Sequence, residues 1–177
     1  TALCVGYSRP PKNKAAEKMT EFLKNHKTEI FIFLLALIVR MILFFVYVHA
    51  NEGNIDGTIH GQDGYYELGK SLIAGKGFSW DGVLPSPFHV PLFPLFLAVS
   101  LFLSGSLLPA LGLQMILGAI VPVLGRRISL KLISSEKIGF WIGLTLALEP
   151  NFILHSFIFY SETLFLFLFS LFILSFI

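Results

Sequence analysis

The chain has too few charged residues to cover the surface of a soluble domain of its size. Only 14% of its 177 residues are Asp, Glu, Lys or Arg, while 55% are hydrophobic and the mean hydropathy is +0.76. A single core cannot bury that much apolar area, because a domain of this length leaves much of its surface in water. The composition therefore excludes an ordinary soluble domain and predicts an all-α, polytopic protein that spans a lipid bilayer.

Cysteine is almost absent, and so are the common motifs of nucleotide and metal chemistry. The lone Cys4 cannot form an intrachain disulfide and belongs to no cluster with metal-ligand spacing. The sequence has no Gly-rich phosphate loop, no His-Glu-x-x-His and no Cys-x-x-Cys. We therefore expect no metal site, no cofactor and no soluble nucleotide donor. Basic residues beside apolar runs report membrane orientation, so we expect no nucleic-acid partner either.

Long apolar runs are what the sequence has in abundance. The first, residues 30–49, measures about 30 Å as a helix at about 1.5 Å per residue, which matches the hydrocarbon core of a bilayer. The basic segment 1–29 before it places the amino terminus in the cytoplasm. Within that segment, residues 15–25 fit either an amphipathic helix on the membrane surface or an unstructured positive flank.

Charge predicts how many later runs cross the membrane. Runs 90–103 and 107–124 lie between an outer loop and the basic cluster 126–137, which belongs in the cytoplasm. An odd number of crossings is then required. The shorter run, 90–103, has Pro91 and Pro94 near its start, so we expect it to be interfacial or re-entrant. The run 107–124 would then be the second span.

Residues 138–157 and 163–177 are expected to form a third and a fourth span. The last run has no basic flank to close it, so we expect the sequence to be the amino-terminal part of a longer protein. The first outer loop, about residues 50–106, would hold two juxtamembrane helices. One is residues 63–74, with Asp63 as its N-cap and Gly75 beyond its end, and the other is the run 90–103.

Ionisable and aromatic residues near the membrane are the candidates for chemistry. Asp63 stands just before Tyr65 and Tyr66 in the outer loop, where it could act as a general base or only cap a helix. Arg40 lies in mid-span, where a charge is costly. It could bind a phosphate, pair with an acid such as Glu149 or Glu162, snorkel to an interface, or pair with a further helix.

Two more residues flank apolar runs. His89 opens a proline-containing helix start, where it could contact a lipid phosphate or be an ordinary interfacial histidine. Glu162 stands at the start of the last run, where it favours the helix dipole or takes part in a site.

The order of these features resembles the start of the GT-C class of membrane glycosyltransferases, which includes the protein O-mannosyltransferases and the lipid A aminoarabinose transferases. The resemblance covers residues 30–177. It rests on an ordered set of segments: Arg40, Asp63-Gly-Tyr-Tyr66, His89-Val-Pro-Leu-Phe-Pro-Leu95, Arg126-Arg127, Pro150 and Ser161-Glu-Thr-Leu-Phe165. The chain departs from the family pattern at Gln62-Asp63, where many relatives have Asp-Glu, and at Val90-Pro91, where many have two prolines.

The resemblance implies a sugar transferase in a bacterial or archaeal plasma membrane, in contact with membrane lipids. A polyprenyl-phosphate sugar would be the donor, and a lipid, glycan or protein the acceptor at the outer face. Asp63 would be the catalytic base, without a tightly bound metal and with at most a weakly held divalent cation. Later helices complete the cavity in relatives, so we expect this fragment to be inactive alone. The substrate-binding residues would be Arg40, Tyr65, Tyr66, His89 and Glu162.

Two non-enzymatic interpretations compete with this one. A transporter or flippase segment would use Arg40 and Glu162 to line a polar path, and Asp63 would tolerate neutral substitution. A membrane assembly subunit would pair Arg40 with a partner helix, so replacing Arg40 would disrupt the complex. The long outer loop, with its acid, paired tyrosines and proline-led helix, favours the transferase because a plain connector needs much less.

Overall fold

The computed structural model describes residues 26–60, 63–81 and 83–177, and this part of the chain is all-helical. Helices make up 74% of it, and it contains no strand. The all-α prediction is therefore confirmed for the described residues. The segment 15–25, for which the sequence allowed an amphipathic helix, lies outside them.

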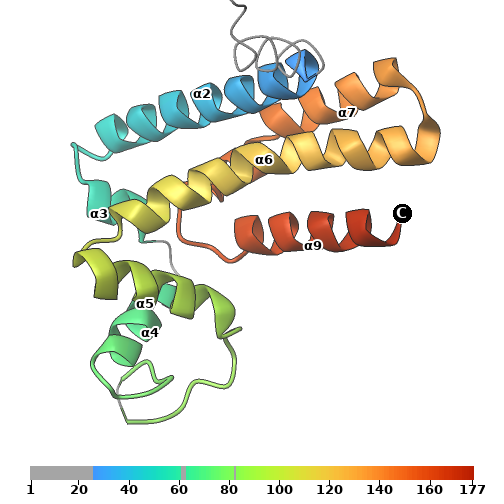
Figure 1. The fold of residues 1–177 in the computed structure, drawn as a ribbon. Helices are drawn as coiled ribbons and strands as arrows, with labels where there is room; N and C mark the ends of the chain where they lie inside the picture. The colour runs from blue at the N-terminus through green and yellow to red at the C-terminus, as the bar shows by residue number, and fades with distance from the viewer. Residues whose placement is uncertain (1–25, 61–62, 82) are drawn as a thin grey trace, which may run out of the picture.

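Four helices form the body of the molecule (Figure 1): α2 (Lys27–Ala50), α6 (Leu108–Ile133), α7 (Glu136–Leu148) and α9 (Glu162–Phe176). The central helix α6 packs against α2, α7 and α9 and runs antiparallel to α2. As a result, the start of α2 and the carboxyl end of α6 lie at the same end of the bundle.

Two of these helices are long and apolar enough to cross a membrane, namely α2 with 24 residues and α6 with 26. Helix α2 contains the predicted run 30–49, and α6 contains the predicted run 107–124 except for its first residue, the N-cap Leu107. Helix α6 continues beyond its run and carries the basic residues Arg126, Arg127 and Lys131 in its last turns. Helices α5 (Leu92–Ser104) and α9 are also apolar but shorter.

The segment expected as the third span, about residues 138–157, forms two helices, because the chain breaks at Pro150 near its expected outer end. Helix α7 ends at Leu148, and the five-residue α8 (Pro150–Leu154) follows. A proline ring disfavours helical backbone at the residue before it and lacks an N–H group, and Glu149 accordingly has extended backbone with ψ of 120°. The Glu149 carboxylate accepts the N–H of Phe152 at 2.7 Å and caps the new helix.

A separate lobe lies at the end of the bundle opposite the start of α2 (Figure 1). It holds α4 (Tyr65–Ile73) packed on α5, and α3 (Ile55–Ile59) connects it to α2. Gly69 allows close packing of α4 on α5, since a Cβ atom there would come within 3.3 Å of Leu97 Cβ and 3.4 Å of the Pro94 carbonyl. The lobe thus contains both helices predicted in the first outer loop.

The start of α4 differs from the sequence prediction. Gly64, not Asp63, is the N-cap, with left-handed backbone at φ 66° and no side-chain cap. A reversal of the chain at this point suits glycine, which has no Cβ to clash. The other end agrees with the prediction, because Gly75 has φ 71° directly after the C-cap Ala74.

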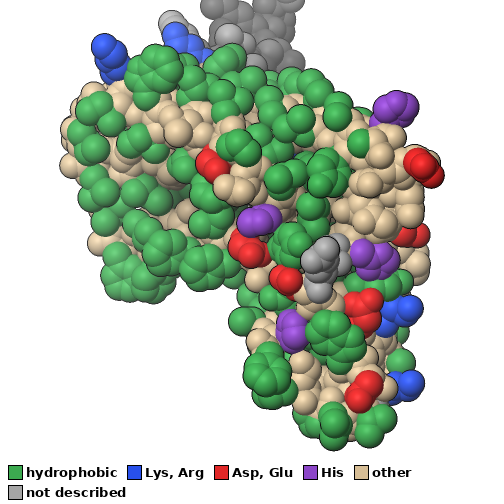
Figure 2. All heavy atoms as spheres, turned by 180° about the vertical axis from the view of Figure 1, so that it is seen from behind, with side chains coloured by type: hydrophobic (Ala, Val, Ile, Leu, Met, Phe, Trp, Pro, Cys, Tyr) green, Lys and Arg blue, Asp and Glu red, His purple; other side chains and the backbone are tan. Residues whose placement is uncertain are grey.

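Two hydrophobic clusters hold the molecule together. One joins the lobe to the bundle through Phe44, Tyr65, Phe93 and Phe157. The other brings α2, α6 and α7 close through small side chains, among them Ala36, Ala119 and Ala147. Figure 2 shows the remaining apolar side chains spread over the bundle surface, while acidic and histidine side chains gather on the lobe and where it joins the bundle.

Candidate functional site

An apolar groove runs between the beginning of α5 and α9. Its volume is about 470 Å³, and among its lining residues only Ser161 and Glu162 carry polar side chains. Both stand at the amino-terminal end of α9. The groove can therefore take a long apolar chain that ends in a polar group. The apolar lining is Val90, Leu92, Phe93, Leu164, Phe165, Leu168, Phe169 and Phe172.

Tyr65 connects the lobe to the polar end of this groove. Its hydroxyl donates a hydrogen bond to Ser161 Oγ at 3.2 Å, and its ring packs edge-on against Phe93 with centroids 5.1 Å apart. Since Ser161 Oγ accepts the hydrogen bond from Tyr65, the Ser161 O–H remains able to donate a hydrogen bond to a ligand. Tyr65, the first residue of α4, thus positions the Ser161 hydroxyl at the start of α9.

His89 holds the Asp63 segment in place. A carbonyl oxygen only accepts, so His89 Nε2–H donates to the Asp63 carbonyl at 2.9 Å. In the neutral ring Nδ1 then accepts from the Ser86 hydroxyl at 3.0 Å. The ring also lies edge-on to Tyr65, with centroids 5.3 Å apart. Both ring nitrogens are therefore engaged, and His89 holds the Asp63 and Ser86 segments in place.

The carboxylate of Asp63 is exposed and makes no hydrogen bond or ion pair with any described residue. Its backbone, in contrast, is restrained on two sides. His89 binds its carbonyl, and the Trp80 indole lies over Gly64, where any Cβ atom would collide with the ring. An acid with a fixed backbone and an open carboxylate is suited to meet a ligand from outside.

Tyr66 faces another way. Its ring lies edge-on to His60 with centroids 4.0 Å apart, and Lys70 Nζ stands 4.9 Å from its ring centre. His60 is the C-cap of α3 and Lys70 is on α4 itself, and Tyr66 does not line the groove. The structure therefore links Asp63, His89, Tyr65 and Glu162 around the groove end and leaves Tyr66 outside this group.

Arg40 also lies apart, fully buried inside the bundle. Its Nη1 donates to the carbonyls of Ala36 at 3.0 Å and Ala147 at 3.4 Å, while Nε and Nη2 have no partner among the described residues. The suggested pairing with Glu149 does not form, because that carboxylate caps α8. Glu162 is not paired with Arg40 either, and its Oε2 is buried without a partner in the described part of the chain.

Three residues that shape the site are missing from the sequence prediction. Gln114 donates from Nε2 to the carbonyls of His155 at 2.6 Å and Ile158 at 2.7 Å, which ties the segment before α9 to α6. Its signal is present in the sequence, since Gln114 is a lone amide in an apolar run. In the sequence, Ser161 is singled out only as part of the family motif Ser161-Glu-Thr-Leu-Phe165. Nothing in the sequence points to Trp80, because its role depends on the position of Gly64 beneath its ring.

The Asp81 side chain holds the loop between α4 and α5 through hydrogen bonds. Its carboxylate accepts the N–H groups of Leu84 and Val83, each at 2.9 Å, and the Ser79 hydroxyl at 3.0 Å. The hydrogen bonds from Leu84 and Val83 hold the pKa of Asp81 below its ordinary value. Within residues 26–60, 63–81 and 83–177, no group of three or more His, Cys, Asp or Glu side chains could hold a metal ion.

Comparison with known proteins leaves the family of this chain open. No protein-family model matches it, no curated protein is significantly similar to it, and no solved structure matches its fold.

Proposed function

We propose that this protein is a membrane glycosyltransferase of the GT-C kind, which transfers a sugar from a polyprenyl-phosphate donor to an acceptor at the outer face of the membrane. The observation that carries the proposal is the link between an open acid and an apolar groove. The His89 ring donates to the backbone carbonyl of Asp63 and packs edge-on against Tyr65. The Tyr65 hydroxyl in turn donates to Ser161 at the polar end of the groove.

The membrane setting is supported by length, surface and charge. Helices α2 and α6 are long enough to span, and large apolar side chains such as Phe45 and Phe165 are exposed on the bundle. In our proposal α2, α6, α7 with the segment after it, and α9 make four crossings, and α4 and α5 lie at the outer interface. Charge supports this orientation, since the lobe has the two described lysines Lys70 and Lys76 and the opposite end has five described basic residues: Lys27, Arg126, Arg127, Lys131 and Lys137.

The proposed reaction is a direct displacement at the anomeric carbon. Asp63 takes the proton of the acceptor hydroxyl or amine as that atom bonds to the sugar, and the bond between the sugar and the phosphate oxygen breaks. The polyprenyl chain would lie in the groove, and the Ser161 hydroxyl would donate to the departing phosphate. No basic side chain lines the groove, so hydroxyl groups are its only side-chain donors.

The first test is Asp63→Asn in the full-length protein, with Asp56→Asn as a matched control. Both acids are exposed in the same outer loop, but Asp56 is the first-turn acid of α3 and not part of the groove end. Membranes receive a labelled polyprenyl-phosphate sugar pool, and label transfer is compared at equal expression. Loss of a general base should lower transfer by about 10²-fold or more, while the control keeps wild-type transfer. Equal transfer by both variants would refute the assignment of Asp63.

A non-enzymatic function is the second candidate, and the bundle interior favours it. Arg40 Nε and Nη2, Gln114 Oε1 and Glu162 Oε2 are all buried without a partner in the described residues. Such groups inside a membrane are costly and mark polar paths or contacts with a further helix. This function predicts wild-type behaviour of Asp63→Asn, and loss of transport or of a complex on replacing Arg40, measured by flux and by native gel.

A further inference from the structure

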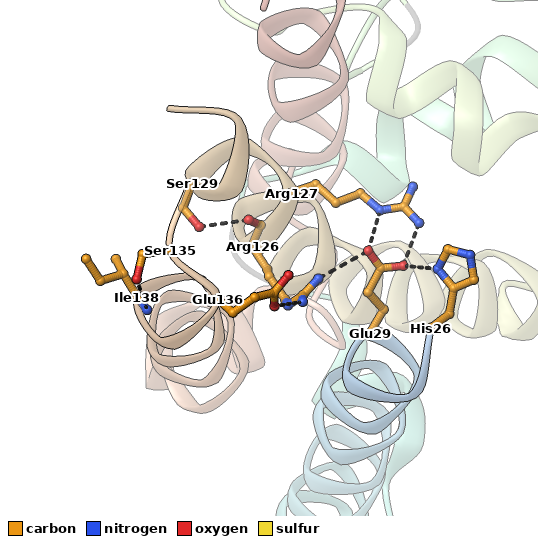
Figure 3. A network of polar contacts seen from close by, with 8 residues as sticks. All are labelled: His26, Glu29, Arg126, Arg127, Ser129, Ser135, Glu136 and Ile138. Atoms are coloured by element: carbon orange, nitrogen blue, oxygen red, sulfur yellow. Dashed lines mark hydrogen bonds and ion pairs between the residues drawn. The ribbon is translucent and has the colours of Figure 1, made fainter. Parts of the chain in front are cut away.

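The end of the bundle opposite the lobe is tied together by one shared carboxylate (Figure 3). Glu29, at the start of α2, accepts two hydrogen bonds from Arg127, from Nε at 2.9 Å and from Nη2 at 2.6 Å. Arg126 Nη1 reaches the same carboxylate at 3.3 Å, and its Nη2 binds Glu136 at the start of α7 at 2.5 Å. The network thus joins α2, α6 and α7.

This arrangement leaves positive charge facing outward. Arg127 uses Nε and Nη2 on Glu29, and its Nη1 has no partner among the described residues. Its side chain is 48% exposed, whereas that of Glu29 is only 14% exposed. Five described basic residues at this end outnumber the two acids Glu29 and Glu136. Among residues 26–60, 63–81 and 83–177, basic side chains are therefore in surplus at this end, and Glu29 is the acid that pairs with Arg127.

An apolar groove begins at this guanidinium. It runs between α2 and α6, has a volume of about 220 Å³ and is walled by the half-buried side chains of Ile30, Phe33, Ile120 and Val123. His26, Glu29 and Arg127 form its polar end. An apolar trough that ends in a fixed cation has the chemistry of a site for an amphiphile with a negative headgroup.

We infer that this groove is a binding site for an anionic phospholipid of the cytoplasmic leaflet, with an acyl chain between α2 and α6 and the headgroup phosphate on Arg127. The inference rests on the membrane setting of the proposed function but not on sugar transfer. Glu29 orients Arg127 over the end of the groove, and the Arg127 guanidinium there favours a negative headgroup over a neutral one.

A second apolar groove, without a charged side chain, serves as a control for the groove at Arg127. It lies along α7, has a volume of about 340 Å³, and is lined by Ile138, Trp141, Ile142, Thr145 and Leu146 without a charged side chain. A lipid that binds through apolar contact alone should occupy both grooves. A lipid that needs the cation should prefer only the groove at Arg127.

The test is a native mass spectrometry titration of the full chain, purified in mild detergent, with phosphatidylglycerol or phosphatidylcholine of identical acyl chains. Wild type should bind phosphatidylglycerol roughly fivefold tighter per engaged basic residue. Arg127→Gln should bind the two lipids equally. It should still fold, because Glu29 keeps its bond to Arg126. Ile120→Trp, which fills the groove, should weaken binding of both lipids, and Thr145→Trp in the uncharged groove should keep the preference.

Several outcomes would overturn the site: equal binding of both lipids by wild type, a preference that survives Arg127→Gln, or a preference abolished by Thr145→Trp. A chain that stays soluble without detergent would also overturn it, by removing the membrane setting. Failure of the transferase is a separate readout, because label transfer responds to Asp63→Asn and lipid preference responds to Arg127→Gln.

Discussion

At the scale of single residues, Gly64 decides where Asp63 lies. Its backbone is left-handed, and the Trp80 ring occupies the space that a side chain would need. Gly53 is a matched control, since it has φ 79° and no atom lies within 4 Å of the place where a Cβ would stand. We expect Gly53→Ala to cost about 1–2 kcal/mol for the left-handed backbone alone. Gly64→Ala should cost more, because Trp80 must also move.

The measurement is the free energy of unfolding of both variants in detergent, together with the label-transfer rate. Only Gly64→Ala should lower transfer, since it displaces the turn that carries Asp63. Equal costs for the two substitutions would show that Trp80 does not restrain this turn.

Asp81 gives the loop a dependence on acid. Its pKa lies below the ordinary 3.8 because the N–H groups of Leu84 and Val83 and the Ser79 hydroxyl bind the ionised form. A lowered pKa in the folded state means that this stabilisation is present above the unfolded-state pKa and is lost as the pH falls through the folded value. We expect the amides of Val83 and Leu84 to be protected at neutral pH and to lose protection below pH 3.8.

Hydrogen exchange, corrected for the intrinsic pH dependence of amide exchange, measures this protection. Asp81→Asn should show the same exchange across that pH range, because an amide side chain does not titrate. An Asp81 carboxyl that titrates at or above 3.8, followed by carbon NMR, would contradict the prediction.

At the scale of helices, the bundle depends on close approach at Gly118 of α6. A Cβ atom there would come within 2.8 Å of Ser156 Cβ and 3.1 Å of Arg40 Nε. Overfilling such a contact costs about 1–3 kcal/mol, so Gly118→Ala should destabilise the bundle by that amount. Gly112 lies on the same helix with nothing within 4 Å, and Gly112→Ala should be neutral or stabilising by up to about 1 kcal/mol.

Thermal unfolding of the two glycine variants in detergent separates helix propensity from packing. If Gly118→Ala were as stable as Gly112→Ala, α6 would have room to shift away from Ser156. The packing of α6 in the bundle would then not depend on the contact between Gly118 and Ser156.

At the scale of the whole molecule, the charge difference between the two ends predicts orientation. We expect Val83→Cys in the lobe, which is 79% exposed in the native residue, to react with a membrane-impermeant maleimide in intact cells. Leu132→Cys, 65% exposed at the basic end, should react only after the membrane is opened. Both variants carry Cys4→Ser, which removes the one cysteine of this sequence. The reverse labelling pattern would invert the proposed topology.

Sequence alone was enough to predict the properties that depend on neighbouring residues. Apolar runs of sufficient length predict helices, glycines after the last turn end them, and basic residues distinguish one end of the bundle from the other. The break at Pro150 is also local. Proline disfavours helical backbone at the residue before it, and Pro150 lies near the outer end of the third expected span.

Only the tertiary structure decided which residues meet. The bond between Tyr65 and Ser161 spans 96 positions, the bonds of Glu29 to Arg126 and Arg127 span 97 and 98, and that of Arg40 to Ala147 spans 107. No periodicity in the chain encodes such pairs, because they depend on how whole helices stack. The same stacking placed Tyr65 beside the groove and turned Tyr66 away, although the two residues are adjacent in sequence.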